Sequence, residues 1–362
     1  MTAGKEKEAE QGLRHLVSDR DLRKEEFFAL METGSRETEE ELFRSARECS
    51  TGIFGRQIYL RGLIEISSVC RNNCYYCGIR RGNREAERYR LSTEEILACC
   101  ETGYRLGYRT FVLQGGEDPV QDDPWVEDTV AAIREGYPGC AVTLSLGEKS
   151  KDSYRRFREA GADRYLLRHE TADPRHYRQL HPPEMSLENR LRCLWDLKEL
   201  GYQTGTGMMI GSPFQTLDIL WEDLMFIRRL RPEMIGIGPY LVHHGTPFAD
   251  RKNGSLTWTL RLLSILRLLY PEVLLPATTA LSTIHPKGRR LGILAGANVV
   301  MPNLGMPGIR EKYELYDNKL CTGQEAAEGR QELEKMMGQI GYTLSESRGD
   351  FQEHSPHCRK EE

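Results

Sequence analysis

Residues 64–83 read IEISSVCRNNCYYCGIRRGN, and the rest of the chain is best interpreted outward from this stretch. It begins as an apolar, β-branched run, which is typical of a buried strand. It continues into a loop that carries Cys70, Cys74 and Cys77 in the spacing C-x3-C-x2-C. Cysteine thiolates hold iron–sulfur clusters, and a cubane of four irons ordinarily takes four of them. Three closely spaced cysteines without a fourth nearby therefore predict a 4Fe-4S cluster with one iron left open for a substrate or cofactor.

A structural zinc loop is the alternative interpretation of this stretch. Structural zinc sites almost always have four protein ligands. The sequence offers no CxxC or HxxxH partner at the spacing of a zinc finger. We therefore favour the iron–sulfur cluster over zinc.

The composition suits a soluble globular enzyme. The chain has 362 residues, of which 39% are hydrophobic and 29% charged, with a net charge of -4 and a pI near 6.2. This balance gives no reason to expect nucleic-acid binding. The polar, acidic start MTAGKEKEAEQGLRH is unlike a signal or transit peptide, and no apolar run approaches the roughly 20 residues that span a bilayer. We expect a cytoplasmic protein without a membrane partner.

The other cysteines follow no motif spacing. Ten cysteines in a cytoplasmic chain do not indicate a disulfide framework, because the cytosol keeps thiols reduced. Apart from Cys321, which is treated below, we interpret the cysteines outside the loop as small buried side chains or incidental surface thiols. They are Cys49, Cys99, Cys100, Cys140, Cys193 and Cys358. An exposed reduced cluster would be oxygen-sensitive, which implies an anaerobic or protected setting.

From about residue 55, short apolar runs alternate with amphipathic segments. Near-continuous apolar strands separated by helices predict a parallel sheet that is buried on both faces. The number of units predicts closure into an α/β, (βα)8 TIM barrel. Helices are expected between the strands, one of them opening with a capping box at Ser92 and Glu95. The expected strands are 57–67, 110–114, 141–146, 163–168, 203–210, 234–239, 273–278 and 298–302.

The same pattern divides the chain into three parts. Residues 1–54 are expected to form an N-terminal helical extension, in which 1–20 are frayed and 21–49 form two helices. Residues 55–320 are expected to form the barrel. Residues 321–362 turn polar and are expected to hold one helix and a disordered or weakly docked tail.

In such barrels the active site lies at the carboxyl ends of the strands. After the second expected strand, Gly115 and Gly116 let the backbone approach a ligand, and Glu117 offers a carboxylate to an ammonium group. Gly-Gly before Asp-Pro is also an ordinary turn. Glu148 and Arg168 close the next two strands and could hold a ligand between them, since arginine clamps carboxylates bidentately. A salt bridge at the barrel rim is the alternative.

Later strand ends supply candidates for a substrate cavity. A threonine hydroxyl there could face an anionic substrate, although such residues often only form turns. Tyr313 and Tyr316 stand three residues apart on one expected helical face, and packing is the default role for such tyrosines. Met209 more often fills a core, but it could line an adenine pocket, and His169 is expected to be a hydrogen-bonded structural histidine. The cavity candidates are Gln114, Thr278, Thr279, Arg310, Tyr313 and Tyr316.

The cysteine loop, with Tyr76 just before its last cysteine, resembles the signature of the radical S-adenosylmethionine (SAM) superfamily. Other segments resemble one branch of it, which contains the FeFe-hydrogenase maturases of the HydE type, methylornithine synthase and biotin synthase. The resemblance runs from about residue 55 to about residue 321. The segments include VLQGGEDP, VTLSLGE, GADRYLLRHET, QTGTGMMIGSPFQT, IGIGPYLVHHGTP, LPATTALSTI and GANVVMPN.

The resemblance implies a barrel with the cluster and SAM at the top of a long cavity. The open iron would chelate the amino and carboxylate groups of SAM, and an electron from the cluster would cleave SAM to methionine and a 5′-deoxyadenosyl radical. No catalytic residue beyond the cluster and SAM is expected. The SAM contacts that we expect are Tyr76, Gly115, Gly116, Glu117, Glu148, Arg168 and Met209.

The resemblance also suggests what the radical acts on. Enzymes of the HydE type act on a cysteine-bound Fe(CO)2CN precursor of the hydrogenase di-iron subcluster, and a polar cavity would suit such an anionic complex. An amino-acid mutase of the methylornithine synthase type and a non-catalytic iron–sulfur carrier are the alternatives. The expected partners are an electron donor such as a ferredoxin or flavodoxin, and other hydrogenase maturases.

One departure from the branch concerns a second cluster. Some members bind one through a cysteine just after the barrel and a following CxxC. Cys321 stands in the first position, but the following TGQEAAEGRQELE supplies no partners, so we expect no second cluster. Sulfur insertion of the biotin synthase kind is disfavoured, because it needs a sacrificial cluster and the expected strands supply only the cysteines of the loop.

Overall fold

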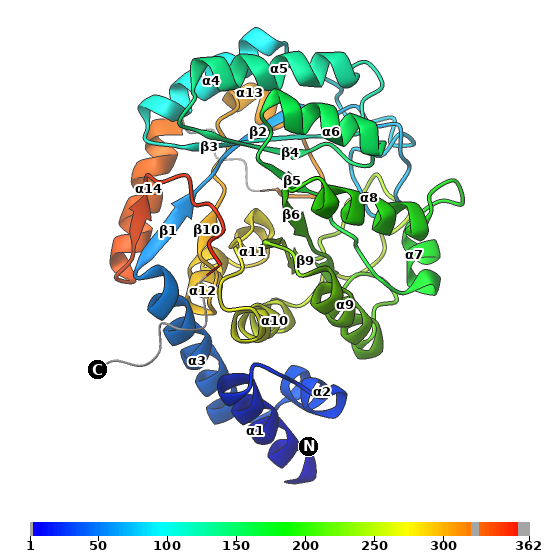
Figure 1. Ribbon diagram of the computed structural model, residues 1–362. Helices are drawn as coiled ribbons and strands as arrows, with labels where there is room; N and C mark the ends of the chain where they lie inside the picture. The colour runs from blue at the N-terminus through cyan, green and yellow to red at the C-terminus, as the bar shows by residue number, and fades with distance from the viewer. Residues whose placement is uncertain (1–2, 320–325, 354–362) are drawn as a thin grey trace.

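The computed structural model describes residues 3–319 and 326–353 and places a ring of parallel strands inside a layer of helices (Figure 1). The (βα)8 barrel that the alternating pattern predicts is confirmed. The first expected strand is divided at Arg61, and two others are divided as well. The strands are β1 (Gln57–Leu60), β2 (Gly62–Ser67), β3 (Thr110–Gly115), β4 (Ala141–Ser145), β5 (Arg164–Leu166), β6 (Gln203–Thr206), β7 (Met209–Ile210), β8 (Met234–Ile235), β9 (Gly238–Pro239), β10 (Val299–Val300) and β11 (Thr343–Ser345).

Pairing of the strands runs around the whole ring. The main sheet has the order β2-β3-β4-β5-β6-β8, and a second sheet has the order β10-β1-β11, all in parallel. Two isolated parallel bridges, Met234 with Leu274 and Pro276 with Val299, link β8 to β10. Residues 273–278, expected as a strand, contribute only these bridges. Because β1 and β2 are consecutive, the ring of pairings returns to its start.

Glycines explain why the middle strands are short. A Cβ atom on Gly207 would lie 2.0 Å from the carbonyl oxygen of Gly236, and Gly207 has φ of 155°. The two backbones therefore approach more closely than any side chain allows. This contact separates β6 from β7 and β8 from β9, where the sequence predicts single continuous strands.

The helices follow the strands and cover the ring. The capping box at Ser92 and Glu95 is confirmed at the start of α4, and most other barrel helices begin with a serine, threonine or aspartate cap. Three short helices, α7, α11 and α13, were not expected. The barrel helices are α4 (Thr93–Arg105), α5 (Asp123–Gly136), α6 (Lys151–Ala160), α7 (Pro174–Leu180), α8 (Leu187–Glu199), α9 (Leu217–Leu230), α10 (Leu256–Leu269), α11 (Thr279–Ile284), α12 (Gly288–Leu294) and α13 (Pro307–Arg310).

The N-terminal helices pack against the barrel and begin earlier than expected. The prediction that residues 1–20 are frayed is wrong, because α1 spans Ala3–Ser18, followed by α2 (Lys24–Glu32) and α3 (Arg36–Phe54). Ala9, Leu13 and Leu16 are buried at helical spacing and join the main hydrophobic core. Because most residues of this segment are charged or polar, its few apolar residues do not show a clear helical pattern in the sequence.

The C-terminal part returns to the barrel. Helix α14 (Ala326–Gln339) leads into β11, which pairs with β1 and was not expected. The expectation of a weakly docked tail is wrong for residues 347–353. Asp350 accepts hydrogen bonds from the buried Arg164 at 2.6 Å and from Gln203 at 3.1 Å. Because both partners lie at the beginnings of β5 and β6, this segment covers the amino-terminal end of the barrel.

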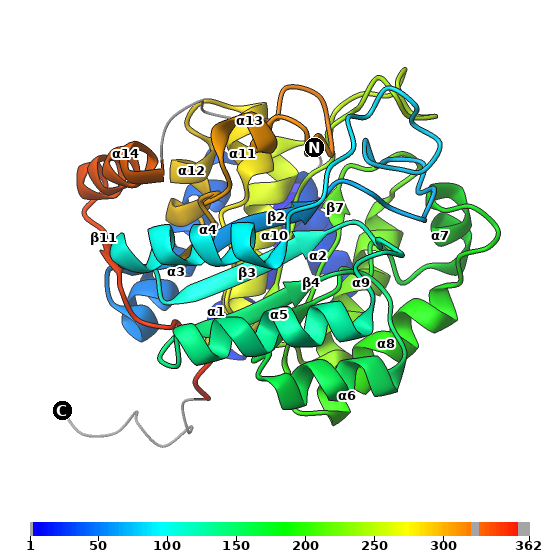
Figure 2. The same ribbon diagram turned by 90° about the horizontal axis from the view of Figure 1, so that it is seen from above.

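The loops that follow the strands gather at the opposite end. Figure 2 shows the cysteine loop, in blue and cyan, at the end of the barrel where α7 lies.

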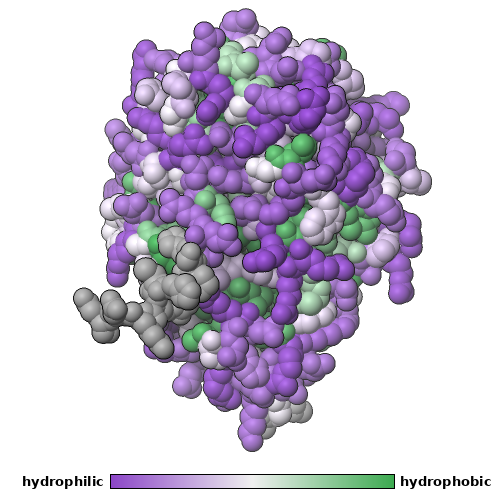
Figure 3. All heavy atoms as spheres, viewed as in Figure 1, coloured by the Kyte–Doolittle hydropathy of each residue, from purple (hydrophilic) through white to green (hydrophobic). Residues whose placement is uncertain are grey.

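The face shown in Figure 3 is mostly hydrophilic, with small separate hydrophobic patches. Within residues 3–319 and 326–353, no helix is long and apolar enough to span a membrane.

Candidate functional site

The cysteine loop is folded by one arginine and supported by one glycine. The guanidinium of Arg88 donates to the carbonyl oxygens of Ile79 at 2.7 Å, Arg80 at 2.7 Å and Asn83 at 3.0 Å. A Cβ atom on Gly116 would lie 2.2 Å from the carbonyl oxygen of Val69 and 2.7 Å from Cβ of Cys70. The loop after β3 therefore lies directly against the first cysteine, where only glycine fits.

The three thiols of this loop form an electrostatically coupled group. Burial raises the pKa of Cys70, raises that of Cys77 to about 12, and raises that of Cys74 well above its ordinary value. Repulsion between their thiolates adds to the effect of burial for Cys74 and Cys77. Soft sulfur ligands that are costly to ionise alone, but are held together, fit an iron–sulfur cluster, since metal binding stabilises the thiolate form.

Glu117 connects the cysteine loop to the loop after β4. Its carboxylate accepts from Nε of Arg71 at 3.0 Å and from the backbone N–H of Glu148 at 2.8 Å. The side chain is 7% exposed. The glycine pair and Glu117 thus stand beside the cysteines, as the sequence predicts, and the carboxylate already holds two loops in place.

Glu148 and Arg168 lie close together without pairing with each other. Glu148 accepts from Nε of Arg190 at 2.5 Å, and Arg168 donates to Glu170 at 2.8 Å. Arg190 also donates to the backbone carbonyl oxygen of Arg168 at 2.7 Å, so one guanidinium joins the ends of both strands. Nε of Arg168 is buried without a hydrogen-bond partner. Arg190 is the fourth residue of α8, and nothing in the sequence of this helix indicates that Arg190 joins the ends of two strands.

Tyr76 and Met209 meet in a small apolar cluster at the same end of the barrel. Buried Met209, Leu180, Tyr240 and Phe248 form this cluster, and half-buried Tyr76 packs against it. The hydroxyl of Tyr76 lies 3.1 Å from Nε2 of His181. Two residues far apart in sequence and both expected at the SAM site are therefore brought together, and His181 is a neighbour that the sequence reading missed.

The barrel interior contains a polar group that includes three unexpected residues. Lys319 donates to Glu65 at 2.5 Å, and Asn303 donates to the same carboxylate at 2.7 Å. Gln114 lies 3.4 Å from the hydroxyl of Tyr313, which is a distant contact. Glu65 occupies an inward position of the apolar β2, and a charged residue in such a run was the available signal.

The other cavity candidates are more scattered. Residues 311–318 do not form a helix, so the expectation that Tyr313 and Tyr316 share a helical face is wrong. Burial raises the pKa of Tyr316 to about 12. Oγ1 of Thr278 is buried without a partner, and Thr279 begins α11. Arg310 donates to the carbonyl oxygen of Gly305 in the adjacent loop.

Two further groups of side chains contain histidines. His169 is fully buried, with Nδ1 2.8 Å from Oγ1 of Thr206 and Nε2 3.5 Å from Asp223, which confirms the structural role expected for it. In the described part of the chain, His243, His244 and Asp317 have ligand atoms within 4.8 Å of one another. Nδ1 of His243 already accepts the N–H of Gly245 at 2.9 Å, so its lone pair is in use.

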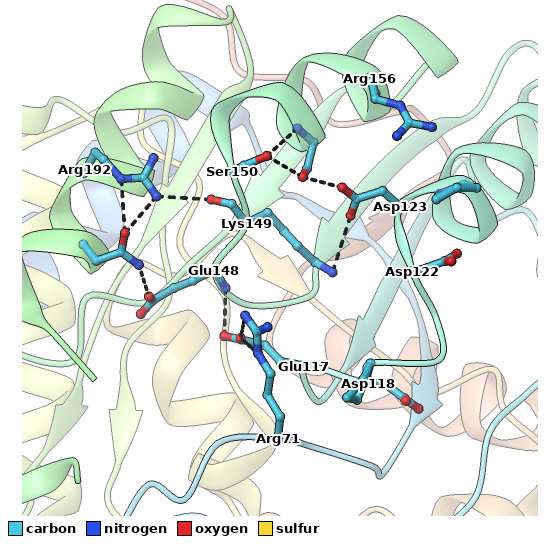
Figure 4. A pocket seen from close by; sticks show the side chains of 14 residues that line it. Arg71, Glu117, Asp118, Asp122, Asp123, Glu148, Lys149, Ser150, Arg156 and Arg192 are labelled. Atoms are coloured by element: carbon cyan, nitrogen blue, oxygen red, sulfur yellow. Dashed lines mark hydrogen bonds and ion pairs between the residues drawn. The ribbon is translucent and has the colours of Figure 1, made fainter. Parts of the chain in front are cut away.

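A polar groove of about 730 Å³ opens beside Glu117 and Glu148. Figure 4 shows Arg71 and Glu117 at one side of it, and Glu148, Lys149 and Arg192 along the other. The amino-terminal ends of α5 and α6 reach the same groove through Asp122 and Ser150. The groove therefore gives access to the carboxyl ends of β3 and β4 from solvent.

Comparison with known proteins settles the family. Residues 64–227 match the model of the radical SAM superfamily. The chain is 47% identical over 283 residues to the FeFe hydrogenase maturase subunit HydE of Thermotoga maritima, covering 78% of this chain and 80% of that protein. The chain belongs to the radical SAM superfamily. It is a radical SAM enzyme with a cysteine loop that fits the cluster of that superfamily.

Other relatives of this radical SAM enzyme agree in fold. The 3-methylornithine synthase of Methanosarcina acetivorans is 31% identical over 307 residues, or 84% of each chain. The crystal structure of methylornithine synthase superposes with a TM-score of 0.81 at 26% identity, over 92% of this chain and 97% of that chain. The maturase HydG of Carboxydothermus hydrogenoformans, at 22% identity and a TM-score of 0.79 over 94% and 79% of the two chains, shares the fold. Cys321, considered above for a second cluster, lies outside the described residues.

Proposed function

We propose that this radical SAM enzyme takes part in the maturation of FeFe-hydrogenase and acts on a cysteine-bound Fe(CO)2CN precursor. The observation that carries the proposal is the 47% identity to a HydE maturase across 78% of the chain. The three-cysteine loop lies within residues 64–227, which match the radical SAM model. The cluster, when bound, supplies the electron that cleaves SAM to methionine and a 5′-deoxyadenosyl radical. The protein itself must bind SAM, orient it and keep water from the radical.

We assign these tasks to the residues around the cysteine loop. Gly115 and Gly116 allow the backbone to approach the ligand, and Glu117 attracts its ammonium group. Arg168, with an unpartnered Nε, binds its carboxylate, because guanidinium groups form charge-assisted hydrogen bonds with carboxylates. Glu148 takes the ribose hydroxyls and is held for this by Arg190. Tyr76 and Met209 provide the apolar wall for the adenine.

The polar interior of the barrel is the proposed place for the substrate. Gln114, Thr278, Thr279, Arg310, Tyr313 and Tyr316 are the side chains that we assign to it. The buried pair of Lys319 and Glu65 adds an ammonium and a carboxylate to the same interior. Hydroxyl, amide and cationic groups suit a small anionic complex, whose cyanide and carbonyl ligands accept hydrogen bonds.

The setting follows from the same chemistry. We propose a single cluster, because the sequence after Cys321 lacks a CxxC, and a ferredoxin or flavodoxin as the electron donor. The cysteines of the described residues form no disulfide, as is usual in a reducing compartment, and we propose a cytoplasmic location. Other hydrogenase maturases would supply the substrate and receive the product.

A second candidate is supported by the similarity to methylornithine synthase, which reaches 31% identity over 84% of the chain. In that case the enzyme would rearrange an amino acid such as lysine. The charged interior of the barrel would then hold the ammonium and carboxylate groups of the amino acid, Glu65 and the arginines being the matching charges.

Anaerobic reconstitution of the full chain with iron and sulfide tests both candidates. The reduced enzyme should convert SAM to 5′-deoxyadenosine, and the rate should rise with the iron precursor and stay unchanged with lysine. Cys74→Ala should abolish the reaction and lower the iron content, whereas Cys140→Ala, a buried cysteine outside the loop, should retain both. Methylornithine formed from lysine would overturn the maturase proposal, and a cluster that cleaves no SAM would favour an iron–sulfur carrier.

A further inference from the structure

Three aromatic side chains, from the loops after β2, β7 and β9, meet at the carboxyl end of the barrel. The ring of Tyr75, next to Cys74 in the cysteine loop, meets the ring of Phe248 edge-on with centroids 6.2 Å apart. Phe248 meets Phe214 in the same way at 6.1 Å. Phe248 is buried, whereas Phe214 is 44% exposed. The aromatic patch of Tyr75, Phe248 and Phe214 therefore reaches from the solvent to the cysteine loop.

The backbone at Phe214 is strained. Its φ of 68° lies in the left-handed region, which bulky side chains rarely adopt. The side chain of Gln215 fixes this turn, since it accepts from the N–H of Gly211 at 2.6 Å and donates to the carbonyl oxygen of Met209 at 2.9 Å. A strained residue that also exposes a large apolar ring indicates a role outside the fold, such as binding a partner.

The side chains around the aromatic patch are mostly basic. The guanidinium of Arg251 lies over the ring of Phe214, 4.8 Å from its centroid. Arg81 of the cysteine loop pairs with Glu184 at 3.4 Å, and both side chains are more than half exposed, so this pair leaves Arg81 available to a partner. The basic side chains next to the patch are Arg80, Arg81, Arg251 and Lys252, and the acidic ones are Glu184 and Asp250.

The whole cysteine loop has the same excess of positive charge. Residues 71–90 contain six arginines and two glutamates, although the net charge of the chain is -4. Glu117 and Asp118 neutralise Arg71 and Arg90, which still leaves the segment positive. Local charge of one sign attracts partners of the opposite sign and speeds their association. This end of the barrel therefore favours an acidic partner.

We propose that the aromatic patch and the arginines around it are the docking surface of the electron donor, an acidic carrier protein with an exposed cofactor edge. The inference rests on the proposed function and deepens it by naming the surface through which the electron enters. Because Tyr75 adjoins Cys74, a protein bound here brings its cofactor close to the cysteine loop. The substrate, by contrast, binds inside the barrel.

The transfer itself needs no further reactant. One electron passes from the reduced carrier, which is oxidised, to the cluster, which is reduced, and no bond is formed or broken. Contacts between redox proteins are small and depend on electrostatic attraction. An aromatic centre with a charged rim has the composition of such a contact.

Calorimetric binding to the reconstituted full chain tests the surface without relying on activity. The probes are an oxidised flavodoxin and an oxidised 2Fe-2S ferredoxin, of which at least one should bind. Phe214→Gly removes the exposed ring and suits the positive φ, so this variant should fold and bind the carrier about tenfold more weakly. Trp195→Ala is the matched control, because Trp195 lies on α8, is 45% exposed and is outside the patch, and it should bind as the wild type does.

Charge is tested separately from the aromatic ring. Arg251→Glu should weaken binding about tenfold, and added salt should weaken binding to the wild type. Arg229→Glu is the control, since Arg229 is exposed in the last turn of α9, which leads to the beginning of β8. Carbodiimide joins lysines directly to carboxylates, so Lys252 should be coupled to the bound carrier. Coupling at Lys5 of α1 in place of Lys252 would contradict the assigned surface.

A chemical reductant separates this inference from the proposed function. Dithionite needs no docking surface, so Phe214→Gly and Arg251→Glu should cleave SAM with dithionite at the wild-type rate and be about tenfold slower with the reduced carrier. No binding of either carrier to the wild type, unchanged affinity in Phe214→Gly, an equal loss in Trp195→Ala, or an equal loss of rate with dithionite overturns the inference alone. Failure of the wild type to cleave SAM with dithionite overturns the proposed function.

Discussion

At the scale of single residues, the structure gives one expected ligand-binding residue a charge partner that the sequence did not indicate. Glu148 and Arg168 end neighbouring strands and are expected to hold one ligand between them. Glu148 is also paired with Arg190, and the side chains of Glu148 and Arg190 are 12% and 8% exposed. Two charges removed from water in this way stabilise little by themselves, but each becomes costly when the other is missing.

Replacement of Arg190 should therefore be costly for the whole chain. Arg190→Ala leaves the carboxylate of Glu148 nearly buried without its cation, and the free energy of unfolding should fall by about 3 kcal/mol. Arg192→Ala, on the exposed side of the same helix and paired with Asp196, is the matched control and should cost less than about 1 kcal/mol. Urea denaturation measures both. Equal losses in the two variants would contradict the buried pairing.

At the scale of elements, the segment after β11 closes the amino-terminal end of the barrel. Asp350 connects it to Arg164, whose side chain is fully buried. Burial alone would raise the pKa of Asp350, but hydrogen bonding to Arg348 and the charge of Arg164 lower it to about 2. A carboxylate with a lowered pKa stabilises the native state, fully so above the pKa of the unfolded chain.

Asp350→Asn should remove this contribution at pH 7, about 2 kcal/mol for a pKa that falls from 3.8 to about 2. Because the folded pKa is depressed, the contribution is lost as the pH falls from about 4 through 2, and roughly half of it should be gone by pH 3. Urea unfolding at pH 7 and pH 3 checks the sign. Asp152→Asn, in an exposed pair with Arg155, is the control. A difference between wild type and Asp350→Asn that grows towards low pH would be inconsistent with the ion pair.

At the scale of the whole molecule, the N-terminal helices share the core of the barrel. Phe27 of α2 packs against Trp221 of α9 with ring centroids 5.7 Å apart. Arg261 of α10 donates to the carbonyl oxygens of Met31 at 2.7 Å and Thr33 at 2.9 Å. A boundary at residue 54 remains a prediction about chain organisation, but the contacts across it indicate one cooperative unit.

Adjacent residues of α1 provide a test of that unit. Leu16 is fully buried and Val17 is 55% exposed. Leu16→Ala should lower the free energy of unfolding by about 3 kcal/mol and shift a single calorimetric transition of the entire chain, while Val17→Ala should leave it within about 0.5 kcal/mol. Two separate transitions, with the barrel transition unmoved by Leu16→Ala, would show that the extension unfolds on its own.

The sequence by itself determined the barrel, its helices and the cysteine loop, because these depend on local information. Apolar runs form strands and helical periodicity forms helices, and Cys70, Cys74 and Cys77 lie within eight residues of one another. Only the tertiary structure decided the partners: Arg190 for Glu148, His181 for Tyr76, Lys319 for Glu65, and Asp350 for Arg164. Each of these pairs joins residues that are distant in the chain, and no spacing along the sequence encodes which of many arginines, lysines or histidines the folded barrel brings to a given carboxylate or hydroxyl.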